Sequence, residues 1–252
     1  MAYSPLYEAT DYFEPFPAPE SVFAKDVDRH MEFLLPLATV SLSHINTKWS
    51  GKVHFVVPIE PWDGLVGEQT TKYHTYLCRT NWIGFKVNRQ WKYSLDADFR
   101  YFLKSDVENR KDVKITKNEM QELNSHYELT RISFDQKRSH FKANGALHAS
   151  YARRRNGQYP DDSRSDLTGE LGGFAGWGNW PEIGDFPLSR HVVFNEEFDE
   201  EETTPLPQAK DESDFVFIGW IPAGIYCKGP SYNLYLFYHR KKRLALTTFD
   251  WS

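Results

Sequence analysis

The sequence predicts an α+β fold: a β-rich, largely antiparallel sheet with one long helix packed across it. The first observation is a series of short runs of β-branched and aromatic residues bounded by Pro, Gly and Asn. The second is one long segment in which apolar residues recur at steps of three and four. The third is an aromatic content of 16%, which can supply a sizeable core although the mean hydropathy is -0.62.

Residues 1–30 are interpreted as an ordered N-terminal arm, and residues 31–252 as a single β-rich domain. A length of 252 residues also permits two small domains. Because prolines interrupt regular structure in the arm, Phe13, Phe16 and Phe23 are expected to pack onto the domain. These prolines are Pro5, Pro15, Pro17 and Pro19.

Strands are predicted wherever β-branched and aromatic residues gather between turn residues. Pro36, Asn46 and Gly51 divide the first of them into separate elements. The last two are joined by the four basic residues 240–243, which predicts a terminal hairpin with a charged tip. The predicted strands are 33–35, 38–40, 53–57, 73–78, 82–87, 93–103, 191–194, 215–221, 232–239 and 244–249.

One long helix is predicted over residues 116–143. Thr116 and Glu119 have the spacing of a capping box, and Asn144-Gly145 is a C-terminal stop. The apolar stripe predicts that one face lies across a sheet while the charged face remains in water. The residues of this stripe are Met120, Leu123, Tyr127, Thr130, Phe134 and Phe141.

Residues 151–187 are expected to form loops, because glycine and proline are closely spaced there. Trp177 and Trp180 lie in the Gly-Trp segment 172–180, which lacks the Lys-Ser or Lys-Thr of a phosphate loop and the helix start of a dinucleotide fingerprint. Two interpretations remain open. The glycines make tight turns with buried indoles, or the indoles line a contact with a ligand or a partner protein.

A strongly acidic segment follows, and it has three interpretations. It is a solvated, mobile loop, or a complementary face for a basic partner such as the cleft of a nuclease, or a calcium site. The calcium interpretation is weakened because the spacing of an EF-hand loop is missing. The acidic residues are Glu196, Glu197, Asp199, Glu200, Glu201 and Glu202, followed by Asp211, Glu212 and Asp214.

The sequence contains no recognisable catalytic, metal or cofactor signature. The nine histidines form no zinc motif and are interpreted as surface residues, with His126 and His140 at the margin of the helical stripe. Cys78 and Cys227 make no disulfide framework, and only Cys227, beside Lys228, is a candidate nucleophile. We therefore expect no catalytic residue, no metal and no cofactor.

Net charge and hydropathy restrict the partners. A formal charge of -5 argues against a general nucleic-acid or acidic-membrane binder, so no direct nucleic-acid contact is expected. The N-terminus has no signal-peptide pattern, and no stretch reaches the length of a membrane span. With only two cysteines, a reducing, cytoplasmic location is expected.

Residues 171–252 resemble the YwqG-like family of uncharacterised bacterial proteins. The likeness lies in Gly172-Gly173 before a Trp/Pro-rich loop, in the run Phe215–Trp220, and in the run Tyr232–Tyr238. The resemblance implies a β-rich cytoplasmic bacterial protein without an established enzymatic activity, with some relatives similar to immunity proteins encoded beside toxins. The long helix and the acidic segment depart from the family pattern.

The leading hypothesis from the sequence is therefore an immunity-type protein that occludes a cognate bacterial toxin. The acidic segment would steer association, and Trp177 and Trp180 would be desolvated anchors. Two alternatives belong to other classes. One is a hydrolase-like enzyme whose site is assembled from dispersed residues, and the other is a scaffold that docks through the arm and the terminal hairpin.

Overall fold

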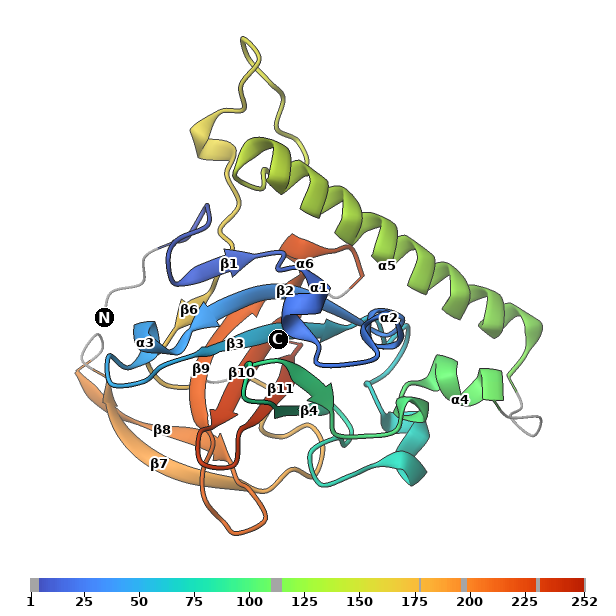
Figure 1. The fold of residues 1–252 in the computed structure, drawn as a ribbon, viewed down its shortest axis with the longest axis vertical. Coiled ribbons are helices and arrows are strands. Elements are labelled where there is room, and N and C mark those ends of the chain that lie inside the picture. The colour runs from blue at the N-terminus through green and yellow to red at the C-terminus, as the bar shows by residue number, and fades with distance from the viewer. Residues whose placement is uncertain (1–4, 110–114, 177, 196–198, 230–231, 252) are drawn as a thin grey trace.

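The computed structural model describes residues 5–109, 115–176, 178–195, 199–229 and 232–251. Its centre consists of two antiparallel sheets, with the long helix on one side and a separate two-stranded ribbon on another (Figure 1). The predicted β-rich, antiparallel α+β fold with one long helix is confirmed.

The first sheet has the order β1-β2-β3, with β1 at Phe13–Pro15, β2 at Leu34–Ser41 and β3 at Lys52–Pro58. The arm therefore contributes a strand to the sheet itself. Phe13 and Phe23 are each 1% exposed, and the Phe16 ring lies 5.5 Å from that of Phe134 on the long helix. The two strands predicted around Pro36 form one strand, because the register shifts between Pro36 and Ala38 and so accommodates the proline.

The second sheet has the order β5-β4-β11-β10-β9-β6. The predicted terminal hairpin consists of β10 and β11, with His239 paired with Leu244 across the basic tip. The strand order places this hairpin at the centre of the sheet. The strands are β4 (Trp82–Val87), β5 (Tyr93–Leu95), β6 (Glu170–Leu171), β9 (Val216–Pro222), β10 (Asn233–His239) and β11 (Leu244–Asp250).

Cores lie on both faces of this second sheet. Because side chains alternate along a strand, Leu234 and Leu236 of β10 enter the main core shared with the first sheet, whereas Tyr235 and Phe237 enter a second core. The second core lies beneath the two-stranded ribbon of β7 (Leu188–Asn195) and β8 (Glu200–Pro207). The ribbon is thus attached to the body through an aromatic cluster.

The long helix α5 spans Lys117–Asn144 and has the predicted caps. The Thr116 hydroxyl accepts from the Glu119 N–H at 3.2 Å, and the Glu119 carboxylate accepts from the Thr116 N–H at 2.7 Å. Gly145 ends the helix at φ 73°, a conformation that glycine adopts without strain. Leu123, Tyr127, Thr130 and Phe134 are buried as the stripe predicts.

The remaining helical segments are short. They are α1 (Pro19–Val22), α2 (Val27–Met31), α3 (Leu42–Ile45), α4 (Leu103–Asn109) and α6 (Ala223–Tyr226), with 3-10 turns at Glu68–Tyr73, Phe99–Tyr101 and Asp161–Ser163. Within the described residues, none of the helices has the length and apolar character needed to cross a bilayer.

Two predicted strands are wrong, and side-chain capping explains both. Residues 73–78 turn instead of extending, because the Thr75 hydroxyl accepts hydrogen bonds from the N–H groups of Leu77 and Cys78. The strand predicted over 93–103 ends at Leu95, since Asp98 caps the following 3-10 turn through the Arg100 N–H at 2.8 Å.

Candidate protein-binding surface

The acidic segment forms part of the β7–β8 ribbon. Glu200, Glu201 and Glu202 lie in β8 and pair with β7, so the loop interpretation does not hold for them. Asp199 occupies the turn before β8 with φ 53°. Glu196 and Glu197 lie outside the described residues. In the described part of the chain β7 and β8 pair only with each other, and Figure 1 shows β7 as the outer strand of the two.

The outer face of the ribbon exposes two large apolar side chains. Val192 is 66% exposed and Phe194 is 58% exposed, and their spacing of two residues places them on one face of β7. Their cross-strand partners are Thr203 and Glu201. An apolar pair at such exposure, rimmed by polar side chains, is a candidate protein contact.

The inner face of the ribbon is anchored to the body. Thr204 is 3% exposed and its hydroxyl donates to the Ala175 carbonyl oxygen at 3.0 Å. Leu206 packs against the second core, and the Ser189 hydroxyl donates to the Asp214 carboxylate at 2.7 Å. The ribbon therefore presents its outer face from a fixed base.

Trp180 belongs to the second core and not to the surface. Its side chain is 0% exposed, its ring packs against those of Trp82, Tyr235 and Phe237, and its indole N–H donates to the Gly176 carbonyl oxygen at 3.4 Å. In this conformation Trp180 has no surface with which to anchor a partner. Trp177 lies outside the described residues.

A cluster of Ser189, His191 and Asp214 beside the ribbon has the residue types of a hydrolase triad but not its geometry. The Ser189 oxygen and one Asp214 oxygen both lie 3.0 Å from the same ring nitrogen, Nε2 of His191. A triad needs the serine on one ring nitrogen and the carboxylate on the other. Here the serine donates directly to Asp214, so the histidine does not activate it.

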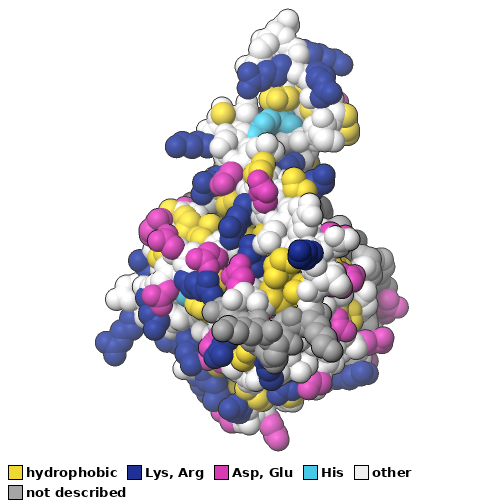
Figure 2. Space-filling model, turned by 90° about the vertical axis from the view of Figure 1, so that its right-hand side faces the viewer, with side chains coloured by type: hydrophobic (Ala, Val, Ile, Leu, Met, Phe, Trp, Pro, Cys, Tyr) yellow, Lys and Arg dark blue, Asp and Glu magenta, His cyan; other side chains and the backbone are white. Residues whose placement is uncertain are grey.

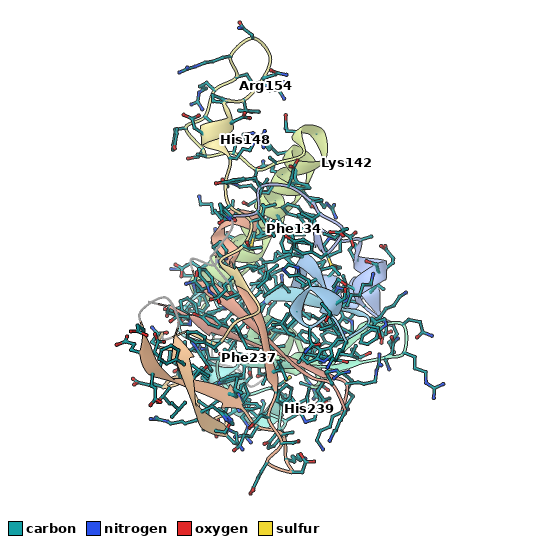
Figure 3. The ribbon with its side chains drawn as sticks, turned by 90° about the vertical axis from the view of Figure 1, so that its left-hand side faces the viewer. Phe134, Lys142, His148, Arg154, Phe237 and His239 are labelled. Carbon is teal, nitrogen blue, oxygen red and sulfur yellow. The ribbon has the colours of Figure 1, made fainter. Side chains whose placement is uncertain are left out.

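In a second cluster, Asp211, Ser213 and His239, the histidine donates a proton to the serine instead of accepting one, so this cluster does not activate the serine either. The Lys242 backbone N–H donates to Nδ1 of His239, so the neutral ring carries its proton on Nε2 and donates it to the Ser213 oxygen at 2.7 Å. Ser213 then donates to Asp211 at 2.6 Å. The cluster joins the basic hairpin tip to the 208–214 turn, and Figure 3 shows His239 in the body of the molecule.

Thr39 and His54 form the pair that most resembles a nucleophile and its general base, because the hydroxyl faces a ring nitrogen. No sequence motif indicated this pair. The Thr39 oxygen lies 2.9 Å from Nδ1 of His54, and Nε2 donates to the Trp91 carbonyl oxygen at 3.0 Å. Burial lowers the His54 pKa to about 3, so the ring is a very weak base at neutral pH. Thr39 is itself 5% exposed, and the pair is therefore structural.

A depression of about 320 Å3 lies above Thr39, between the arm and β3, and opens to solvent. Its volume is at the lower end for small-molecule sites. Tyr12, Lys52 and Trp91 line it together with acidic side chains of the arm. Because the hydroxyl at its floor is committed to His54, the depression supplies no activated nucleophile.

Glu60 is a buried carboxylate that also has a structural explanation. It accepts hydrogen bonds from the N–H groups of Leu103 and Lys104 at 2.7 and 2.9 Å and from the Tyr127 hydroxyl at 2.6 Å. Burial raises its pKa, and these three donors act in the opposite direction. Glu60 thereby joins the start of α4 to α5. The cavity beside it, about 10 Å3, has room for a single water molecule.

The candidate nucleophile Cys227 is buried, as is Cys78, and burial raises the pKa of each thiol to about 12. A thiol in that state is not a nucleophile at neutral pH. Within the described parts of the chain, no group of three or more His, Cys, Asp or Glu side chains is placed to hold a metal ion. The calcium interpretation of the acidic segment gains nothing from the residues described.

The predicted surface histidines divide into two kinds. His30, His54 and His239 are buried, at 3%, 0% and 5% exposure, so the surface interpretation is wrong for them. His126 at the margin of the helical stripe donates through Nε2 to the Ile59 carbonyl oxygen at 2.7 Å, and so fastens α5 to the end of β3.

Comparison of the chain with protein-family models, with curated proteins and with solved structures gives no match. The resemblance of residues 171–252 to the YwqG-like family is not supported by these comparisons.

Proposed function

We propose that this chain is a binding protein that engages a basic partner protein through the outer face of the β7–β8 ribbon. The observation that carries the proposal is the exposure of Val192 and Phe194 on the same face as the exposed carboxylate of Glu201, with Glu200 also exposed at the adjoining end of β8. The two kinds of side chain have different tasks. The apolar pair would lose water on docking and hold the partner, and the carboxylates would speed its approach.

The free strand adds a means of recognition. In the described part of the chain β7 has one strand neighbour, so the backbone groups of its outer edge are available to an extended segment of a partner. A partner segment that alternates apolar and basic side chains would match Val192 and Phe194 with the first kind and Glu201 with the second. This replaces Trp180 as the anchor, because Trp180 is buried.

The specific form of this function that we propose is immunity: occlusion of a cognate bacterial toxin, with a basic-cleft nuclease as the class that suits the carboxylates best. The support for this form is the family resemblance together with the acidic ribbon. A toxin gene beside the gene for this chain would support it, and growth rescue on co-expression of the two would test it directly. Unimpaired toxicity in the presence of the soluble, folded chain would refute the immunity form.

The surface itself is tested by site-specific photo-cross-linking in the native host. A benzophenone amino acid at Phe194 is expected to capture a basic protein. The matched control is the same group at Ile132, which is 45% exposed on α5, away from the ribbon in Figure 1. An identical set of adducts at both positions would remove the ribbon from the function.

The captured partner then permits an electrostatic test. Glu200→Gln with Glu201→Gln should slow association about tenfold at low ionic strength and much less at high salt, because long-range steering is screened. The control is Glu122→Gln with Glu128→Gln, which removes the same charge from the exposed face of α5. Equal association rates for the two double variants would exclude steering by the ribbon.

A further inference from the structure

A basic projection extends from the body at the far end of α5. We define it as residues 137–164, comprising the last turns of α5 and the segment that returns from it (Figure 1). Figure 2 shows Lys and Arg side chains gathered over this projection around a histidine, and Figure 3 places Lys142, His148 and Arg154 on it. None of the contacts that hold the ribbon involves these residues.

The base of the projection is held by a stack of rings. Nε2 of His140 and Nδ1 of His148 lie 2.9 Å apart, and the Tyr159 ring stacks on His148 with centroids 4.3 Å apart. The Arg154 guanidinium lies 5.2 Å from the centre of the Tyr159 ring and donates to the Asn144 side chain at 3.0 Å. These contacts fasten the returning segment to the helix end, so its shape is preorganised.

The tip of the projection is a tight hairpin. Arg155 and Gln158 exchange two backbone hydrogen bonds, at 2.7 and 3.0 Å, across Asn156 and Gly157. Both central residues have positive φ, 51° and 81°, which is the requirement of a type I′ turn and the reason that Asn-Gly occurs there. Arg153 and Arg155 therefore lie on the same side of an exposed turn, in the segment that leads into it.

Charge is segregated between this projection and the body. Residues 137–164 contain seven Lys or Arg and two Asp, a formal charge of +5, whereas the whole chain carries -5. The rest of the chain therefore carries -10. Among the described residues, no carboxylate lies within ion-pair distance of Lys137, Lys142, Arg153, Arg154 or Arg155. These cations are available to an external anion.

We propose that the basic projection binds single-stranded nucleic acid, with its arginines on backbone phosphates and the Tyr151 ring stacked on a base. Tyr151 is 77% exposed and lies two residues before the arginine run, so an aromatic surface for a base and cations for phosphates are close together in the chain. Arginine suits the phosphates because its planar fork makes two parallel hydrogen bonds. Net charge alone predicts no such contact, because it averages over two segregated regions.

Other anionic partners fit less well. A bilayer surface would require apolar side chains to insert, and among the described residues of the projection Tyr151 is the sole exposed large hydrophobic residue. An acidic protein would satisfy the arginines but would leave the Tyr151 ring without a flat partner. The strongly acidic body repels any polyanion, which confines the contact to the projection and limits its length.

The contact is small, and its salt dependence follows from its size. With about four phosphates neutralised, the slope of log K against log salt for a single strand is about -3. Binding should therefore weaken about 50-fold between about 50 and about 200 mM salt. Removing two cations, and with them two of the about four phosphate contacts, should reduce the slope by about half and weaken binding roughly 10- to 30-fold near 100 mM salt.

The test uses the full chain and a fluorescein-labelled oligouridylate of about 12 nucleotides, a length within the range of single-strand sites. Binding is followed by anisotropy as salt is raised. The informative variant is Arg153→Ser with Arg155→Ser, neither of which contributes a side-chain contact to the ring stack. The charge-matched control is Lys48→Ser with Lys241→Ser, two exposed lysines outside the projection. Tyr151→Ala tests stacking, with an expected loss of roughly fivefold or more.

The outcomes are distinct. The proposal is supported when the arginine variant loses affinity and salt slope while the lysine variant keeps both, and an oligodeoxynucleotide arm shows whether the sugar matters. Equal losses in both double variants would mean attraction by general charge, which overturns the proposal. Tighter binding to a polyglutamate peptide of the same length, or to vesicles with anionic lipid, would assign the projection to that partner instead. The ribbon variants at Glu200 and Glu201 should leave oligonucleotide affinity intact or raised, which keeps this test separate from that of the proposed protein contact.

Discussion

The buried imidazole of His54 predicts a measurable loss of stability in mild acid. Its ring is 0% exposed, with Nδ1 facing the Thr39 hydroxyl and Nε2 donating to the Trp91 carbonyl oxygen. The hydrogen bond to Thr39 needs the neutral ring, because a protonated Nδ1 would have to donate and Thr39 would have to rotate to accept, whereas the bond from Nε2 to Trp91 persists in either state. Burial accordingly lowers the His54 pKa from 6.5 to about 3.

The sign and size of the effect follow from proton linkage. Between pH 6.5 and about 3 the unfolded chain binds a proton at His54 that the folded chain does not, so the free energy of unfolding falls as the pH falls. At 1.36 kcal/mol per pH unit, His54 accounts for about 2 kcal/mol lost between pH 7 and pH 5. The full contribution of His54 is present above pH 6.5 and is exhausted below about pH 3.

The assay is urea denaturation of the wild type and of His54→Gln at pH 7, 6 and 5. Glutamine does not titrate, and its amide retains one donor and one acceptor for Trp91 and Thr39. The variant is expected to be less stable at pH 7 but to lose about 2 kcal/mol less than the wild type on going to pH 5. His44→Gln, at an exposed position, is the control for removal of an imidazole. Parallel pH profiles for wild type and His54→Gln would refute the assignment of this acid sensitivity to His54.

Three further predictions concern stability and reactivity. Glu60→Gln should lower the free energy of unfolding by urea by about 3 kcal/mol, because the NH2 group of glutamine would face hydrogen-bond donors where the carboxylate has an acceptor oxygen. A loss below about 1 kcal/mol would contradict this account. Thr116→Ala should cost about 1 kcal/mol by removing the helix cap, and Thr116→Ser should restore most of it in the same titration. Cys78 and Cys227 should not react in the native state with an aromatic disulfide that releases a yellow thiolate when a protein thiol attacks it, and both should react in denaturant. Rapid reaction of the native protein would show that a buried thiol is accessible.

Local patterns predicted the parts of the fold in which sequence neighbours supply the hydrogen bonds. The bounds of α5 followed from Thr116, Glu119 and Gly145, which act within one turn of the helix ends. The terminal hairpin followed from two apolar runs with a four-residue basic connection, and it forms the centre of the second sheet.

Partners distant in sequence explain where prediction from local patterns failed. The strand predicted over 93–103 extends to the start of α4, yet Glu60, more than forty residues earlier, accepts hydrogen bonds from the first N–H groups of α4 and so favours a helix there. One interpretation of the acidic segment is a solvated loop, because runs of charge usually lie in solvent, but Glu200–Glu202 pair with β7 on a ribbon whose inner face is held by Thr204. No local pattern indicates that Thr204 reaches Ala175.

The two proposed surfaces, the ribbon and the basic projection, are opposite in charge and are attached to the body separately. The ribbon is attached through the second core beneath it, whereas the basic projection is attached through α5 and its ring stack. Because neither attachment uses residues of the other, a ligand on one surface has no packed element by which to reshape the other. Coupling is left to electrostatics: a polyanion on the projection neutralises positive charge, and a basic protein on the ribbon neutralises negative charge. Each ligand therefore makes the field of the chain more favourable for the other, and a single complex that contains both a basic protein and a nucleic acid is the assembly that this charge pattern suits best.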